Sequence, residues 1–140
     1  MDVRELRSDA EIEAAFPLMA VLRERLRKET FLEEVRRQQV EGYRLFGGFV
    51  GGKLVCLAGA RRSHTLARGE HLFVDDLVTE ESERGQGHAG QMLRHLADRA
   101  RAEGLGRMYL DSRATAQGFY AKVGFTFLSS IPCWLDLGSE

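Results

Sequence analysis

Two apolar, strand-like runs separated by a pair of glycines place the strongest constraint on the fold of this chain. The runs cover residues 43–50 and 53–60, and Gly51-Gly52 lies between them. A two-residue glycine turn between β-rich runs is typical of a hairpin, because glycine adopts the φ angles that tight hairpin turns require. Residues 61–69 are interpreted as a polar loop or strand end, and 70–79 as the next strand. The sequence therefore predicts three antiparallel strands in mid-chain.

The segments on either side of these strands show helical or strand periodicity in turn. Ser8 or Asp9 can cap a helix that presents Ile12, Phe16 and Met19 at three- and four-residue spacing. The charges between residues 23 and 28 are interpreted as the solvated side and ends of the first helices. The other expected elements are strands at 3–6, 107–111, 125–128 and 133–137, and helices at 29–40, 87–104 and 114–123. We expect an α/β (α+β) protein with one domain, residues 1–140.

The stretch Gly85-Gln86-Gly87-His88-Ala89-Gly90 is a literal G-x-G-x-x-G before a helical pattern, and Asp111 follows about 20 residues later. A dinucleotide-binding fold nevertheless does not fit. In that fold the first glycine comes directly off a strand, whereas residues 80–84 separate the glycines from the strand here. The residues after Asp111 also leave room for only one short helix and two strands.

The same stretch has the chemistry of a phosphate site. The glycines permit close backbone approach, and the amides from Gly85 to Ala89 lie at the N-terminus of a helix, which attracts anions. Arg84 adds a full positive charge beside them, and its planar fork suits a pair of pyrophosphate oxygens. The simpler alternative is a glycine-rich helix cap with an exposed arginine.

Two segments resemble the GCN5-related N-acetyltransferase (GNAT) family. Arg84, Gly87 and Ala89 fit the family's pyrophosphate loop, Arg/Gln-x-x-Gly-x-Gly/Ala, and "AQGFYAKVGF" at residues 116–125 is similar to its A-x-x-x-Y-x-K-x-G-F segment. The resemblance covers residues 70–128. It departs at Arg113, where the family often has Asn, and at His88, where the family usually has an aliphatic residue.

The resemblance implies a mixed, mostly antiparallel sheet that splays between the strands at about 70–79 and 107–111, with helices on both faces. It also implies transfer of the acetyl group of acetyl-CoA to a primary amine, by direct attack in a ternary complex. Tyr120 would donate a proton to the departing thiolate, since a phenol with a pKa of about 10 stays protonated at neutral pH. The residues implied to bind the coenzyme are Leu77, Val78, Thr79, Arg84, Gly85, Gln86, Gly87, His88, Ala89 and Gly90.

A base is needed to neutralise the attacking amine, and Asp75 and Asp76 are the leading candidates. A strand that carries two acids into apolar surroundings is unusual, because unpaired buried carboxylates are costly. Neighbouring strand residues point to opposite faces, so we expect at most one of them to reach the site directly. His71 and solvent water are further alternatives. Either aspartate could instead cap a bulge or pair with an arginine.

Composition limits the partners. The net charge is −1, so no global field would gather nucleic acid or an anionic membrane. No apolar run approaches the roughly 20 residues that a bilayer requires, and we expect a cytoplasmic protein without a metal. The expected acceptor is a small cationic amine, polyamine- or amino-acid-like. A protein or peptide acceptor, a non-catalytic coenzyme A-binding module and a homodimer are alternatives that the sequence leaves open.

Overall fold

The computed structural model of the protein describes residues 1–138. The chain divides into two compact units, Met1–Leu110 and Asp111–Glu140, and each is described by itself. The first unit is built around one five-stranded sheet with the strand order β1-β2-β3-β4-β5. The first four strands are antiparallel neighbours, and β5 runs parallel to β4. The bounds are Asp2–Glu5 for β1, Tyr43–Val50 for β2, Lys53–Thr65 for β3, Gly69–Thr79 for β4 and Met108–Leu110 for β5.

The predicted hairpin is confirmed. Strands β2 and β3 pair through a turn at Gly51 and Gly52, which have φ angles of 55° and 80°. Residues 61–69, predicted as a polar loop or strand end, begin as a strand end, because β3 continues to Thr65 and pairs there with Gly69 of β4. Arginine side chains at positions 61 and 62 can lie on a strand because they have acidic partners on neighbouring elements.

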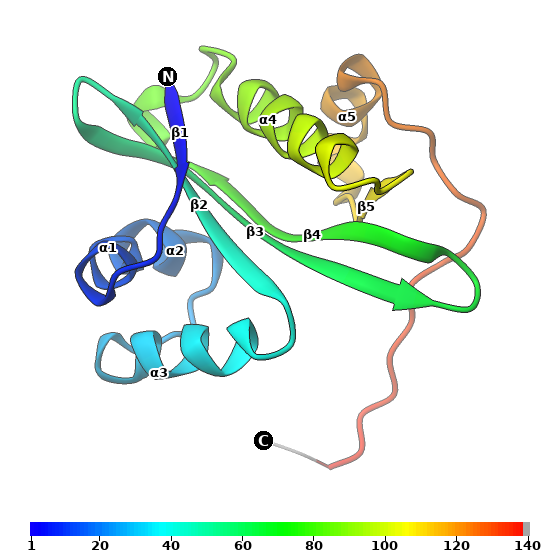
Figure 1. Ribbon diagram of the computed structural model, residues 1–140, viewed down its shortest axis with the longest axis horizontal. Coiled ribbons are helices and arrows are strands. Elements are labelled where there is room, and N and C mark those ends of the chain that lie inside the picture. Colours follow the sequence, from blue (N-terminus) through cyan, green and yellow to red (C-terminus); the bar gives the residue numbers. More distant parts are fainter. Residues whose placement is uncertain (139–140) are drawn as a thin grey trace. The chain divides into compact units, whose positions relative to one another are not determined.

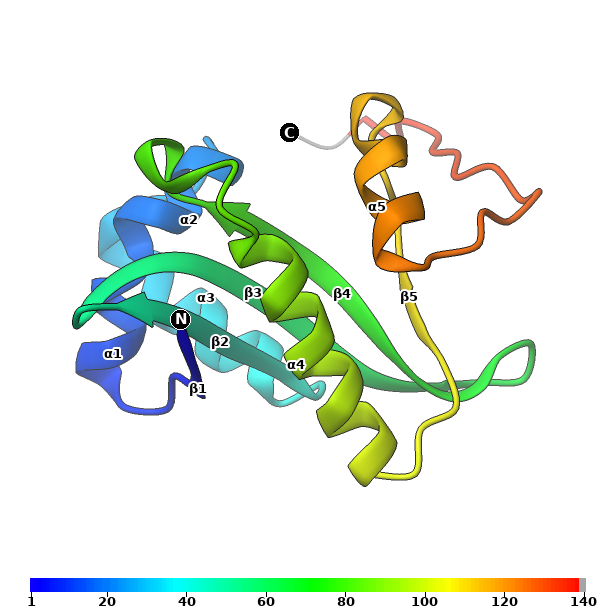
Figure 2. The ribbon, with the colours of Figure 1, turned by 90° about the horizontal axis from the view of Figure 1, so that it is seen from above.

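Helices cover both faces of the sheet. Helices α1 (Asp9–Ala14), α2 (Phe16–Leu22) and α3 (Lys28–Gln39) lie on one face, and α4 (His88–Ala102) lies on the other (Figures 1 and 2). The sequence predicts one helix over the residues that form α1 and α2 in the structure. The helix is interrupted at Ala15 because Pro17, in the first turn of α2, lacks the amide that would continue the ladder.

Each face of the sheet has its own buried core. On the side of α1–α3 the core includes Ile12, Met19, Phe31, Leu45 and Leu57. On the other side, α4 buries a stripe of apolar side chains at helical spacing, which confirms its predicted amphipathic pattern. The buried residues of this stripe are Met92, Leu93, Leu96 and Ala100.

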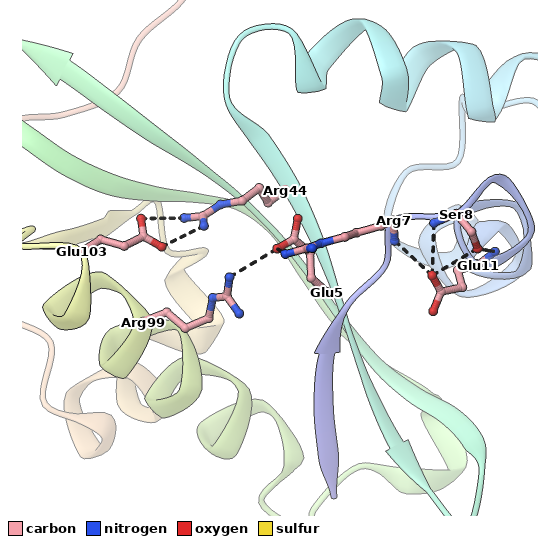
Figure 3. Close-up of polar contacts among 7 residues, drawn as sticks. All are labelled: Glu5, Arg7, Ser8, Glu11, Arg44, Arg99 and Glu103. Atoms are coloured by element: carbon pink, nitrogen blue, oxygen red, sulfur yellow. Dashed lines mark hydrogen bonds and ion pairs between the residues drawn. The ribbon is translucent and has the colours of Figure 1, made fainter.

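Ion pairs fasten the C-terminal end of α4 to the sheet (Figure 3). Arg44 of β2 binds both carboxylate oxygens of Glu103, with Nη1 to Oε2 and Nη2 to Oε1 distances of 2.8 and 3.1 Å. Arg99 of α4 contacts Glu5 of β1 at 3.3 Å. The hydrogen bonds from Arg44 lower the pKa of the Glu103 carboxyl. Helix α1 is fixed separately by a capping box between Ser8 and Glu11.

The second unit contains a short helical segment. A 3₁₀ turn at Ala114–Ala116 leads into α5 (Gln117–Val123), which ends at Gly124 with a φ of 116°. The predicted helix and its glycine stop are confirmed. The predicted strands at 125–128 and 133–137 are wrong, since residues 124–138 contain no strand. Their aromatic and aliphatic composition favours β-structure, but a strand also needs a neighbour to take its backbone hydrogen bonds.

Candidate active site

The site is organised by a bulge in β4. The register of β3 and β4 shifts between Gly59 and Ala60, which oppose Asp76 and Val74, so Asp75 is an extra residue on β4. A bulge breaks the alternation of side chains between the two faces. The expectation that Asp75 and Asp76 point to opposite faces is therefore wrong. Both carboxylates reach side chains on the face of the sheet that carries α1–α3.

Asp75 is held by an arginine of the neighbouring strand. Arg61 Nε donates to Asp75 Oδ2 at 2.6 Å, and Arg61 Nη2 donates to Asp75 Oδ1 at 2.9 Å. The guanidinium also lies over the Phe73 ring, 5.5 Å from its centroid. The hydrogen bonds to Asp75 raise the pKa of Arg61. The Asp75 side chain is nevertheless 26% exposed and can be reached from outside.

Asp76 is held by two groups from other elements. Arg23, which follows the last residue of α2, donates from Nε to Asp76 Oδ1 at 2.9 Å. Tyr43 of β2 donates its hydroxyl to Asp76 Oδ2 at 2.8 Å. Burial of Tyr43, and then the charge of Asp76, raise the pKa of this phenol well above its ordinary value, so it stays a proton donor. The Asp76 side chain is only 13% exposed.

Beyond the bulge, β4 has one free edge. Strand β5 pairs only with residues 72–74, whereas β4 continues to Thr79. Among the described residues, no strand pairs with this edge of β4 beyond Val74. The opposite edge stays paired with β3 as far as Thr79. Leu77, Val78 and Thr79 thus lie on a strand segment that can offer backbone groups to a ligand.

The glycine-rich loop leads from this strand to α4. Gly85 and Gly87 have φ angles of 80° and 84°, which residues with a side chain rarely adopt. A Cβ on either glycine would meet no atom within 4 Å, so the conformation, not the space, requires glycine here. Arg84, Gln86 and the two glycines are exposed. No side chain caps α4 among the described residues, and its first amides are available to an anion.

Three residues complete the loop. Arg84 donates from Nε to the carbonyl oxygen of Thr79 at 3.3 Å, which places its guanidinium beside the end of β4. His88, the first residue of α4, is 8% exposed, and its Nε2 lies 3.3 Å from Glu83 Oε1. The loop therefore combines a guanidinium, positive-φ glycines and a helix N-terminus. This donor set fits a pyrophosphate group.

Tyr120 lies on α5 in the second unit. Its ring packs edge-on against Phe119 and Phe125, with centroid distances of 5.0 and 5.5 Å. Burial raises the pKa of the Tyr120 phenol. The hydroxyl thus stays protonated at neutral pH, which the predicted general acid requires. Arg113, at the residue where the family often has Asn, is exposed at the start of the 3₁₀ turn.

His71 lies far from the paired aspartates. It is buried near the start of β4, where its Nδ1 is 2.8 Å from the carbonyl oxygen of Gly69 and its ring packs against Tyr109. His71 and Asp75 are four positions apart on the strand, a span of about 13 Å. The structure therefore does not bring His71 together with the carboxylates.

The sequence reasoning missed Arg23, Tyr43, Gly59 and Arg61. The sequence predicts a solvated Arg23, and Arg61 on a polar loop or strand end, but each binds one of the aspartates, which is the arginine pairing given above as an alternative. The signal was present in the two adjacent acids themselves, because carboxylates on a half-buried strand need cationic or hydrogen-bonding partners. Gly59 could not have been singled out, since its role depends on which residue faces it.

Residues 1–138 contain no group of three or more His, Cys, Asp or Glu side chains that could hold a metal ion. None of the helices in this part of the chain combines the length and the apolar character that a membrane span requires.

Comparisons with known proteins agree with this architecture. The model of the acetyltransferase (GNAT) family matches residues 4–125. The chain is 36% identical, over 132 residues, to the uncharacterized N-acetyltransferase YhdJ of Bacillus subtilis strain 168. The aligned region covers 91% of this chain and 93% of that protein.

Solved structures share the fold. A Trypanosoma brucei acetyltransferase has a TM-score of 0.80 at 22% identity, covering 97% of this chain and 99% of that one. The aminoglycoside N-acetyltransferase AAC(6')-Iy, solved in complex with CoA, has a TM-score of 0.82 at 18% identity, covering 97% of this chain and 94% of its own. At these identities the likeness concerns the fold, and it confirms the expected mixed, mostly antiparallel sheet with helices on both faces.

Proposed function

This chain belongs to the GNAT family and is an acetyl-CoA-dependent N-acetyltransferase, and on that premise we propose that it acetylates the primary amine of a small, amino-acid-like acceptor. The observation that carries the proposal is the bulge that brings Asp75 and Asp76 to one face of β4, each beside an arginine. Because the arginines balance the aspartates, the cluster has no excess negative charge. That balance favours an acceptor with both an amine and an anionic group over a polyamine.

The arginines are accessible enough to take part in recognition. The side chains of Arg61 and Arg23 are 39% and 45% exposed, whereas that of Asp76 is 13% exposed. A guanidinium binds a carboxylate with its planar fork, and one that already binds an aspartate keeps further N–H donors. In the proposed complex, Asp75 contacts the ammonium group of the acceptor, and Arg61 contacts its carboxylate.

The coenzyme would be held by the loop and the free edge of β4. Arg84 and the amides of residues 85–90 would bind the pyrophosphate. Backbone groups of Leu77, Val78 and Thr79 would pair with the amide groups of the pantetheine arm. Acetyl-CoA, when bound, supplies the activated acetyl group.

Two side chains would then handle protons. Asp75, the more exposed aspartate, would accept a proton from the ammonium group, so that the amine attacks directly in a ternary complex. Tyr120 would donate its phenolic proton to the departing thiolate, a role that its raised pKa supports.

Assembly as a homodimer is part of the proposal. The segment after α5 exposes large apolar side chains, including Ile131, Trp134 and Leu135, which are 81% to 88% exposed. Such side chains are rarely left in water and are typical of interfaces. The single-domain organisation and the cytoplasmic location stay predictions.

The proposal is tested by titration calorimetry followed by an acceptor screen. Acetyl-CoA is expected to bind and NAD and NADP are not, and Arg84→Ala should weaken acetyl-CoA binding about tenfold or more, because one charge-assisted contact contributes about 1.5–3 kcal/mol. Arg37→Ala, an exposed charge removed from α3, is the matched control. Thiol release with acetyl-CoA is then measured over amino acids, polyamines and peptides.

Each result has a definite meaning. Turnover with amino-acid-like amines supports the proposed acceptor. Turnover confined to polyamines would contradict it, and turnover confined to peptides would identify a protein acetyltransferase. If the protein binds NAD and does not bind acetyl-CoA, the interpretation of the glycine-rich loop as a coenzyme A site is wrong.

A further inference from the structure

We propose that Arg23 is a positioning residue: it holds the bulge of β4 in place and thereby orients the free strand edge that receives the coenzyme. The inference rests on the proposed function, because it assigns the edge at residues 77–79 to coenzyme binding. It gives Asp76 a role that differs from that of a catalytic base. Asp76 is the anchor through which Arg23 and Tyr43 act on the strand.

Arg23 bridges both residues of the bulge. Its Nη2 donates to the backbone carbonyl oxygen of Asp75 at 2.7 Å, and its Nε donates to Asp76 Oδ1 at 2.9 Å. The extra residue of a bulge is left out of the strand ladder, so its backbone groups need other partners. Here the side chain of the residue that follows α2 supplies one. A single planar guanidinium thus fixes the backbone of Asp75 and the side chain of Asp76 at once.

The second oxygen of Asp76 is bound by Tyr43, and Gly59 leaves the space for this contact. The Tyr43 hydroxyl donates to Asp76 Oδ2, so both oxygens of this carboxylate are engaged. Tyr43 is 4% exposed, and its hydroxyl lies over Gly59, the residue that faces Asp76 on β3. A Cβ on Gly59 would overlap with that hydroxyl. The absence of a side chain at Gly59 therefore makes room for the hydrogen bond.

The contacts of Arg23 and Tyr43 with the bulge lie next to the proposed coenzyme site. The bulge lies directly after the last β4 residue that pairs with β5, Val74, and directly before residues 77–79. A bulge bends its strand and increases the local twist. The direction of the free edge beyond the bulge thus depends on how the bulge is held. Displacing by about 1 Å a group that positions a substrate can lower a rate by about 100-fold.

The test compares Arg23→Ala and Arg23→Lys with Arg25→Ala, which removes an exposed arginine of the same loop. Three quantities are measured on the full chain: the Kd of CoA, the kcat and KM values with a working acceptor, and hydrogen exchange of the amides in β4. Arg23→Ala is expected to raise the Kd of CoA about tenfold and to speed exchange at residues 75–79, but not in β2. Lysine cannot span both acceptors, so Arg23→Lys should resemble Arg23→Ala.

A double-mutant cycle is the second test of this inference. Tyr43→Phe removes the other hydrogen bond to Asp76, and if both residues act through the bulge, the effects of Tyr43→Phe and Arg23→Ala on the Kd of CoA should not be additive. Additive effects would overturn the inference, as would full recovery of affinity in Arg23→Lys. A rise in the acceptor KM alone, with the Kd of CoA unchanged, would instead make Arg23 an acceptor contact.

Failure of this inference can be told from failure of the proposed function. If the unaltered protein binds CoA and Arg84→Ala weakens that binding, the coenzyme site stands. An unchanged Kd and unchanged exchange in Arg23→Ala would then refute only the positioning role. A general loss of stability is recognised by a lowered Tm and by faster exchange throughout the sheet.

Discussion

Arg61 occupies both carboxylate oxygens of Asp75, although the two residues lie on neighbouring strands and 14 positions apart in the chain. The pair is possible because the bulge turns Asp75 to the face of the sheet on which Arg61 lies. Asp75 is thereby fixed in one orientation while part of its side chain stays exposed. The proposed base is thus held beside a guanidinium that can also contact an acceptor.

The first prediction concerns Asp75. Asp75→Asn keeps the shape of the side chain but removes its charge, and we expect kcat to fall about 100-fold, the contribution of a typical general base. Steady-state kinetics at neutral pH measure the fall in kcat, with Asp98→Asn on the exposed side of α4 as the control. An unchanged kcat in Asp75→Asn would assign proton removal to solvent or to another group.

The second prediction concerns Tyr120. Tyr120→Phe removes only the hydroxyl, and we expect kcat to fall between about 100- and 10,000-fold while the Kd of CoA stays the same. Because burial raises the pKa of Tyr120, the unaltered enzyme should keep its acid form beyond pH 10, the ordinary value for the phenol. Calorimetry and kinetics on the same preparations separate the two quantities. Loss of CoA affinity with normal kcat would contradict the acid role.

The third prediction concerns Gly59. Gly59→Ala would place a methyl group where the Tyr43 hydroxyl lies, and we expect the free energy of unfolding to fall by about 1–3 kcal/mol, the usual cost of overpacking. Gly106→Ala is the matched control, since a Cβ there meets no atom within 4 Å and no positive φ is involved. Urea unfolding of both variants gives the comparison. Equal stabilities would show that the space beside Tyr43 adapts freely.

The fourth prediction concerns the pH dependence of stability. Arg44 lowers the pKa of Glu103 below its ordinary value of 4.5, so the contribution of this pair is fully present above about that pH and is lost as the pH falls through the lower value in the folded protein. Glu103→Gln should cost about 1 kcal/mol at pH 7, a modest amount because the pair is partly exposed.

The cost should shrink as the pH falls below 4.5, because the native carboxyl then becomes protonated and neutral like the amide. Thermal unfolding between pH 3 and 7 measures the difference, and Glu34→Gln on the exposed side of α3 is the control. A difference in stability that does not change with pH would mean that packing, not charge, accounts for the effect of Glu103.

Local signals in the sequence were enough for most of the fold. The hairpin at Gly51-Gly52, the amphipathic pattern of α4 and the glycine stop of α5 each depend on residues close together in the chain, and all three predictions are confirmed. The glycine-rich loop was found for the same reason. Its donors come from one continuous stretch, so a linear motif contains them all.

Only the tertiary structure decided the rest, because it depends on which distant residues face one another. The bulge at Asp75 depends on the register between β3 and β4, and neither strand contains that register by itself. Arg23, Tyr43 and Arg61 come from three different elements and meet at two aspartates. The strands expected at 125–128 and 133–137 failed for the related reason that strand propensity specifies no partner. The sequence thus determined most of the elements and the glycine-rich loop, and the packing of the elements determined the charge and orientation of the candidate acceptor site.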